Sequence, residues 1–365
     1  INALSRSLQT DHFSRLGGVE SQGSRSTLMD FNPTYVEGIE YWKSSIIKLE
    51  EVLIEDTNYR SVAKEILLQK LAGLVRNRSL HLISPSIYKI LEVLPESRLE
   101  VFRATNKALA MGGKFISEKE EYELTKLIEA SKPQSFSERY KLFLAVPDYH
   151  YTTAKSFDEY LNEIAKKMAQ EFIETGLMWS DYCEHFLKLD QQGGYIFGKH
   201  IGELLNGNTE YINDIITLSI NELKRIPIAE RNINVLKGII SSVHDPKLRS
   251  EIITLFFSDD DINYFTVEIL SSIKPTIEEL FQLFMIVDKE IITIEALAHF
   301  KYGKALFHLS PEEIIKFCRK ISSYGHNGIW TALAIIFMYC FQNEDRLKAC
   351  EIFIREILLT KDLIL

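Results

Sequence analysis

Apolar residues recur along most of the chain at the spacing of an α-helix with one buried face. The first clear series has steps of three and four residues: Tyr35, Ile39, Trp42, Ile46, Leu49 and Leu53. Thr34 and Glu37 form the start signal called a capping box, in which each side chain bonds the backbone N–H of the other residue. We therefore expect a long amphipathic helix from about Thr34 to about Leu53.

The same start signal returns throughout the chain. Ser117 with Glu120, Ser135 with Glu138, and Ser156 with Glu159 repeat it, and later starts are marked by Asp245-Pro246, Pro275-Thr276 and Ser310-Pro311. Ser84-Pro85 opens a further short helix that ends near Leu94, and Gly176 is typical of a helix C-terminus. Starts arrive about every twenty residues, and the few β-branched runs lack hairpin turns. We expect an all-α fold.

Roughly sixteen helices joined by short polar turns can form a globular helical array or a stack of antiparallel pairs, an α-solenoid. We favour the α-solenoid. No tetratricopeptide consensus fits the pairs, so the expected class is a degenerate helical-repeat array, HEAT/TPR-like, with pairing of the HEAT kind. The best internal break is Asp148–Ser156. The predicted organisation is a loop segment over residues 1–30, an N-terminal helical block over 31–147 and a C-terminal helical-repeat block over 156–365.

Composition and charge narrow the class of protein. Apolar residues make up 46% and charged residues 25% of the chain, as in globular proteins. The net charge of −9 provides no field for a polyanion, which disfavours nucleic acid as a partner. No apolar run approaches the roughly 20 residues of a membrane span. With a start at Ile1 and no leader, we expect a fragment of a longer cytoplasmic protein that does not bind a membrane.

A glycine-rich stretch near the N-terminus has the spacing of a phosphate-binding loop. Four residues separate Gly18 from Gly23, as in the Walker A motif, but Ser24 stands where that motif requires Lys. The preceding residues are polar, whereas a phosphate-binding loop follows a buried strand. We therefore expect a structural loop without a cofactor, in which Gly17, Gly18 and Gly23 allow a tight turn and Arg25 binds a carboxylate.

Other candidate sites lack the spacing that chemistry needs. Cys183 and His185 point in different directions on a helix, which predicts a buried thiol and a surface imidazole. The four cysteines have no CxxC spacing and the histidines form no HExxH motif, so we expect reduced thiols and no metal. Asp259-Asp260-Asp261 is expected to begin a helix, where carboxylates meet free backbone N–H groups. No catalytic, cofactor-binding or metal-binding residue is predicted.

Aromatic residues give the best candidate for protein binding. Tyr149, His150 and Tyr151 lie at the expected break, and aromatic side chains in loops are common at interfaces. The alternative is ring packing between two helical blocks. A later apolar series is expected to lie in the core: Ile329, Trp330, Leu333, Ile336 and Phe337.

Several segments together resemble a known family. They are SRLGGVESQGSRS, FNPTYVEGIEYWKSSIIKLEEVL, GGYIFGKHIGELL, LKGIISSVHDPKLRSEIITLFF, HFKYGKALFHLSPEEIIKFCRKI and ALAIIFMYCF. They resemble the C-terminal helical-repeat (sensor) regions of bacterial antiphage STAND NTPases of the Avs-like group. By position, Phe197-Gly198 match a helix start in that family, and Tyr302-Gly303 with Leu309-Ser310 match a late helix–turn–helix.

The resemblance implies a sensor that binds a phage protein, such as a large terminase subunit or a portal protein. The ATPase and effector activities would then reside elsewhere in the parent protein, through which the chain could also oligomerise. An acidic helical array would suit a partner with basic patches. Two other functions stay open, a scaffold for self-assembly and an enzyme whose residues converge from distant helices.

Overall fold

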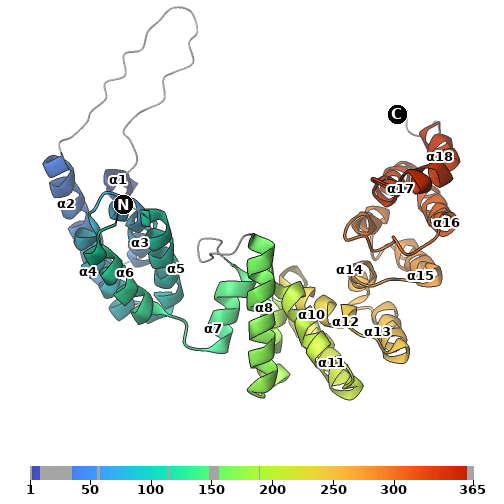
Figure 1. The fold of residues 1–365 in the computed structure, drawn as a ribbon, viewed down its shortest axis with the longest axis horizontal. Coiled ribbons are helices and arrows are strands. Elements are labelled where there is room, and N and C mark those ends of the chain that lie inside the picture. Colours follow the sequence, from blue (N-terminus) through green and yellow to red (C-terminus); the bar gives the residue numbers. More distant parts are fainter. Residues whose placement is uncertain are drawn as a thin grey trace, which may run out of the picture. The chain divides into compact units, whose positions relative to one another are not determined.

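The computed structural model describes residues 2–8, 35–55, 58–113, 116–147, 156–188 and 190–359. Within these ranges the chain forms eighteen α-helices and no β-strand, and one isolated antiparallel bridge joins Lys188 to Arg231 (Figure 1). The predicted all-α helical array is confirmed. The chain divides into two compact units, Ile1–Leu142 with Asp148–Phe157 and Phe143–Pro147 with Asp158–Leu365.

The first unit holds the helices α1 to α7. Their bounds are α1 Asn2–Ser7, α2 Tyr35–Ile54, α3 Arg60–Arg76, α4 Leu80–Val93, α5 Arg98–Gly112, α6 Glu118–Ser131 and α7 Phe136–Tyr140, with a 3₁₀ turn η1 at Pro95–Ser97. The apolar series of α2 points inward as predicted, since Ile46, Leu49 and Leu53 are buried. They join Leu67, Leu74 and other side chains of α3 to α6 in one core.

The second unit holds the helices α8 to α18. Their bounds are α8 Phe157–Glu174, α9 Trp179–Leu187, α10 Gly194–Leu204, α11 Thr209–Arg225, α12 Asn234–Ser241, α13 Pro246–Ser258, α14 Thr266–Ser272, α15 Ile277–Asp288, α16 Pro311–Ser322, α17 Gly325–Cys340 and α18 Glu344–Leu358. The short elements are the π-helix η3 Lys141–Ala145 and the 3₁₀ segments η5 Ile228–Glu230, η6 Asn263–Phe265 and η7 Ile294–Lys301. Aromatic side chains pack against one another around α8 to α10, where the ring centres of Trp179 and Phe186 lie 4.9 Å apart.

Helices pack mainly on helices that lie close to them along the chain. The pairs with the most extensive packing include α3 with α5, α2 with α3, α10 with α12, α16 with α17 and α17 with α18 (Figure 1). Such local packing is the pattern in which each element contacts only its near neighbours in sequence.

The predicted capping signals form most of the helix starts that they marked. Complete capping boxes join Ser117 to Glu120, Ser135 to Glu138, Thr276 to Glu279 and Ser310 to Glu313. Asp245 accepts a hydrogen bond from the backbone N–H of Leu248 at 2.7 Å, with Pro246 in the first helical position. Gly176 ends α8 with a positive φ of 67°, as expected of a C-terminal cap.

One helix start was predicted too late. The helix expected at Ser84-Pro85 begins at Leu80, so that Pro85 lies inside α4. Leu80 and Ile83 are buried, and their packing extends the helix toward the N-terminus by more than one turn. Tertiary burial outweighs the preference of proline for the first turn.

Two glycines bring α10 and α12 into backbone contact. A Cβ atom on Gly198 would lie 1.9 Å from the carbonyl oxygen of Val235, and one on Gly238 would lie 2.1 Å from the carbonyl oxygen of Tyr195. Both obstructing atoms belong to the backbone, which cannot move aside as a flexible side chain could. Phe197-Gly198 therefore stand inside α10, which begins at Gly194, and not at the helix start that the resemblance implied.

Candidate protein-binding surface

Three aromatic side chains form an exposed stripe along α17 and the residue directly after it: Trp330, Phe337 and Phe341. Trp330 is 54% exposed, Phe337 64% and Phe341 49%. Their spacing of seven and four residues places them on one side of the helix, and the rings of Phe337 and Phe341 lie 6.0 Å apart. We call these three residues the aromatic stripe.

The aromatic stripe corrects the expectation that the whole apolar series lies in the core. Ile329 and Ile336 are buried as predicted, whereas Trp330 and Phe337 are not. The helix α17 is apolar almost all round, and such a pattern does not reveal which side the neighbouring helices cover. Large exposed aromatic side chains are typical of a surface that binds another molecule.

A groove with a volume of about 570 Å³ lies beside this stripe. It runs between the turn that follows η7 and the start of α18. It is lined by Lys301, Tyr302, Gly303, Lys304, Phe307, Met338, Phe341, Gln342, Asn343 and Arg346. We call it the basic groove, because its charged lining residues are two lysines and an arginine. Phe341 belongs to both the stripe and the groove, which makes them one continuous surface.

The three cations of the basic groove lie over aromatic rings. The Lys301 nitrogen is 4.9 Å from the ring centre of Tyr302, and the Lys304 nitrogen is 5.9 Å from that of Phe307. The Arg346 guanidinium lies 4.4 Å from the ring of Phe307 and 4.5 Å from that of Tyr339. These are cation–π distances, which restrict where each charge can stand.

Arg346 is held more firmly than the two lysines. Its guanidinium donates hydrogen bonds to the carbonyl oxygen of Phe307 at 2.8 Å and to that of Tyr339 at 3.3 Å. The Tyr339 hydroxyl in turn donates to the carbonyl oxygen of Leu309 at 2.8 Å. These bonds fix the turn after η7 against α17 and α18.

Among the residues that the structure describes, no carboxylate lines the basic groove. Within the described ranges, none of Lys301, Lys304 and Arg346 has an acidic group within ion-pair distance. Another pocket of the second unit has a cation with an acidic partner. Arg319 lines that pocket and forms an ion pair with Glu356 at 2.7 Å. Three cations that line one groove in a chain of net charge −9 are a local departure from its overall charge.

Two of the four non-glycine residues with a positive φ in the described ranges line the basic groove. Lys304 has a φ of 59° and Gln342 a φ of 56°, in the left-handed region that residues with a side chain rarely adopt. Both line the groove. Residues held in this region cost free energy and cluster at ligand sites, which adds to the argument from exposure and charge.

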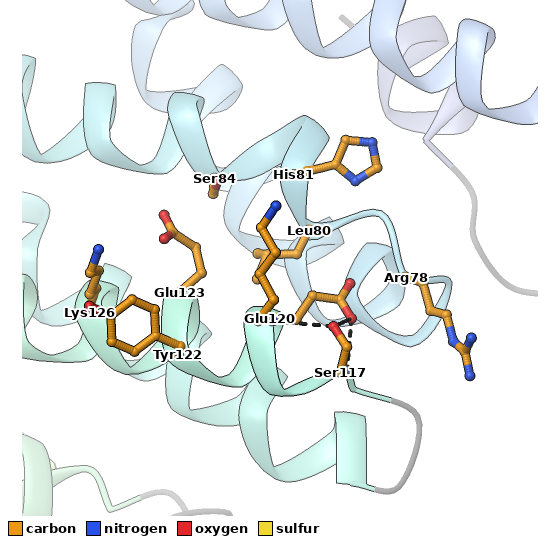
Figure 2. Close-up of a pocket in the computed structure, with 10 residues that line it drawn as sticks. Arg78, Leu80, His81, Ser84, Ser117, Glu120, Tyr122, Glu123 and Lys126 are labelled. Carbon is orange, nitrogen blue, oxygen red and sulfur yellow. Dashed lines mark hydrogen bonds between the residues drawn. The ribbon is translucent and has the colours of Figure 1, made fainter.

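The first unit contains a pocket of similar size, about 600 Å³, between the N-terminal part of α4 and α6 (Figure 2). It is lined by Arg78, Leu80, His81, Ser84, Ser117, Lys119, Glu120, Tyr122, Glu123 and Lys126. Here cations and carboxylates are mixed. Figure 2 shows Glu120 turned back to Ser117, and its carboxylate accepts a hydrogen bond from the backbone N–H of Ser117 at 3.0 Å as part of the capping box.

The thiol of Cys183 is buried and His185 is exposed, as predicted. The Cys183 sulfur lies 3.8 Å from the hydroxyl of Ser219, which also accepts a hydrogen bond from the indole N–H of Trp179 at 3.0 Å. Burial raises the pKa of Cys183 to about 11. The protonated thiol at neutral pH is a poor nucleophile.

The acidic cluster does not begin a helix, which corrects that expectation. Asp259 caps the C-terminus of α13, and its carboxylate accepts a hydrogen bond from the backbone N–H of Asp261 at 3.1 Å. Lys224 pairs with Asp259 at 2.6 Å. The short side chain of Asp259 stabilises a tight turn between two helices, a role that aspartate also favours.

The remaining predicted sites lie outside the described residues. They are the candidate binding residues Tyr149, His150 and Tyr151 and the glycine-rich loop with Gly17, Gly18, Gly23 and Arg25. In the part of the chain that the structure describes, no three His, Cys, Asp or Glu side chains gather as a metal ion would require. Across the same ranges, no helix is both long and apolar enough to cross a membrane.

Comparisons with known proteins add no relative. No family model, curated protein or solved structure matches this chain. The surface formed by the aromatic stripe and the basic groove was missed at the sequence level. The segment Lys301-Tyr302-Gly303-Lys304 carries a weak signal, two lysines around an exposed tyrosine, but Arg346 lies about forty residues further along and joins it only in the folded chain.

Proposed function

We propose that this chain is a protein-recognition module that binds a partner protein through the surface of an α-solenoid. The packing of each helix on near neighbours in sequence supports a solenoid arrangement. The observation that carries the proposal is the aromatic stripe with the basic groove beside it. Aromatic residues and arginine are enriched at protein interfaces, and tryptophan, tyrosine and arginine dominate the binding energy there.

The resemblance to Avs-like sensor regions supplies the partner class. We propose that the module belongs to a larger cytoplasmic bacterial defence protein of the STAND NTPase type. Its partner would be a phage protein such as a large terminase subunit or a portal protein. The proposal assigns no enzymatic step to these residues, since ATPase and effector activities would reside in the parent protein.

Co-expression of the chain with candidate phage proteins, followed by size-exclusion chromatography, tests this function. We expect a stable heterocomplex that is lost when Trp330 and Phe337 are both replaced by Ser. Tyr41, which is 57% exposed on α2, provides the matched control as Tyr41→Ser. A complex that survives the double substitution would place the interface elsewhere, and no complex with any phage protein would reject the partner class.

Self-assembly is a second candidate, favoured by α18. Ile352 is 74% exposed and Leu359, directly after the helix, is 80% exposed. Their spacing of seven residues puts them on one side of the helix axis, where a second copy could cover them. Sedimentation of the chain alone tests this candidate, which requires a homo-oligomer that Ile352→Glu converts to a monomer.

A further inference from the structure

We propose that the basic groove binds a short acidic segment of the partner, in which carboxylates alternate with aromatic or aliphatic side chains. This inference rests on the proposed function and names the chemistry that its surface recognises. It also refines the expectation that an acidic helical array selects a basic partner, because the charge of this groove is opposite to that of the whole chain.

The charge of the groove is the first argument. Lys301, Lys304 and Arg346 line one depression, and its lining within the described ranges has no acidic group. Placing cations side by side without counter-charges is unfavourable, and a ligand that supplies carboxylates relieves this repulsion. Since Arg346 is held by two backbone carbonyls, its position is fixed before a ligand arrives. Binding then requires little ordering of the protein.

The aromatic rings decide between an acidic peptide and a nucleic acid. Bases stack on free aromatic faces, but Phe307 is approached by both Lys304 and Arg346, and Tyr302 lies under Lys301. Cations therefore cover the rings of Phe307 and Tyr302, and the exposed ring of Phe341 is left for an apolar side chain of the ligand. The net charge of −9 also opposes a polyanion that continues beyond the groove. A peptide can instead place its carboxylates on the cations only where they occur.

The apolar lining of the groove indicates which side chains of the ligand lie between its carboxylates. Met338 and Phe341 form one wall, and the exposed ring of Phe337 continues it along α17. Apolar side chains of the ligand can cover this wall while neighbouring carboxylates reach the lysines. A volume of about 570 Å³ lies within the roughly 300–1,000 Å³ of pockets that hold small ligands, which suits a short segment and not a folded domain.

Fluorescence anisotropy with labelled peptides and the whole chain tests the inference. The probe is a peptide of about ten residues, roughly 33 Å long when extended, that alternates Glu with Phe or Leu. Three comparison probes carry Lys in place of Glu, Ser in place of the apolar residues, and oligodeoxythymidine. We expect only the first probe to bind well, and binding should weaken as salt rises from about 0.05 M to about 0.5 M.

Charge reversal shows whether the groove is the site. The double variant Lys301→Glu/Lys304→Glu should weaken binding of the acidic peptide at least about tenfold, because two attractive charges become repulsive. Neither lysine takes part in an ion pair within the described ranges, so the fold should persist, and a circular dichroism melt checks this. Lys126→Glu is the matched control, since Lys126 lies 4.5 Å over the ring of Tyr122 in the other pocket.

Each outcome supports or rejects the inference. Unchanged peptide affinity in the double variant, or no peptide binding at all, overturns it. Equally tight binding of oligodeoxythymidine through the same lysines assigns the groove to nucleic acid instead. A phage protein that forms a complex insensitive to the charge reversal would reject this inference and leave the recognition module intact. Peptide binding without any phage complex would reject the partner class and retain the groove as a binding site for an acidic peptide.

Discussion

Two pockets of nearly equal volume, about 600 Å³ in the first unit and about 570 Å³ in the second, are built from the same residue types with different results. Both contain a lysine over an aromatic ring, Lys126 over Tyr122 and Lys304 over Phe307. Both also contain a non-glycine residue in the left-handed region, Arg78 in the first and Lys304 in the second. Among the lining residues that the structure describes, only those of the first pocket include carboxylates (Figure 2).

The carboxylates of the first pocket are used within the protein. Glu120 completes the capping box of α6 with Ser117. Glu123 hydrogen-bonds the Tyr88 hydroxyl, so that burial, the negative charge of Glu123 and this bond together raise the pKa of Tyr88. In the part of the chain that the structure describes, Lys301 and Lys304 of the basic groove have no carboxylate partner, and Arg346 is held by backbone carbonyl oxygens instead of a carboxylate. The comparison teaches that partnering, and not residue type or volume, distinguishes a surface available to a ligand from one satisfied by the fold.

Replacing Gly328 by Ala should have the largest effect and should disrupt the second pocket alone. A Cβ atom there would lie 2.2 Å from the carbonyl oxygen of Ile321 in α16, and backbone cannot move aside cheaply. We expect a loss of about 3 kcal/mol in the free energy of unfolding, with displacement of α17 and weaker ligand binding. Urea denaturation of Gly328→Ala and of its control Gly112→Ala measures the change in unfolding free energy.

The matched control for Gly328→Ala is Gly112→Ala beside the first pocket. Its added Cβ would meet only side-chain atoms, the nearest 3.0 Å away on Ile116, which can shift. We expect a change within about 1 kcal/mol, because alanine favours the helix by a similar amount. Equal losses in both variants would contradict the prediction, because the backbone contact at Gly328 would then restrict the chain no more than the side-chain contact at Gly112 does.

Arg346→Met should have the next largest effect. The substitution removes two charge-assisted hydrogen bonds, to Phe307 and Tyr339, and the cation over both rings. We expect a loss of about 2 kcal/mol in unfolding free energy. Arg78→Met in the first pocket should change stability by less than about 0.5 kcal/mol, since Arg78 is exposed. A harmless Arg346→Met would show that this cation is not preorganised.

The helices could be predicted from the sequence, whereas the candidate surface could not. Capping boxes such as Ser117 with Glu120 and Ser310 with Glu313 are local, so four consecutive residues contain the whole interaction. The exposure of Trp330 depends on which side of an all-apolar helix the neighbours cover, and that is a tertiary fact. Arg346 meets Phe307 across about forty residues, without a spacing rule to announce it.

Relief of backbone strain should have a smaller effect that separates the two pockets by function. Lys304→Gly and Arg78→Gly should each stabilise the protein by about 0.5–1 kcal/mol, because glycine adopts a positive φ without steric cost. Only Lys304→Gly should also weaken binding of the acidic peptide, by removing one cation. Thermal melts and anisotropy measure the two effects, and weaker peptide binding by Arg78→Gly would contradict the assignment of the ligand to the second pocket.

The smallest expected effect tests whether Glu123 is engaged internally. Burial is the first cause of the raised pKa of Tyr88, so Glu123→Gln should lower this pKa only in part, toward its ordinary value. Because the folded phenol holds its proton more strongly than the unfolded one, its contribution to stability is full below about pH 10 and falls as the pH rises through the folded pKa. Glu123→Gln should reduce that alkaline loss.

Titration of ¹³C-labelled tyrosine by NMR measures the pKa of Tyr88. Glu120→Gln is the control, which should weaken the capping box and leave the pKa of Tyr88 unchanged. A Tyr88 pKa that does not respond to Glu123→Gln would mean that the Glu123 carboxylate is as available as the cations of the basic groove, and the contrast between the two pockets would fail.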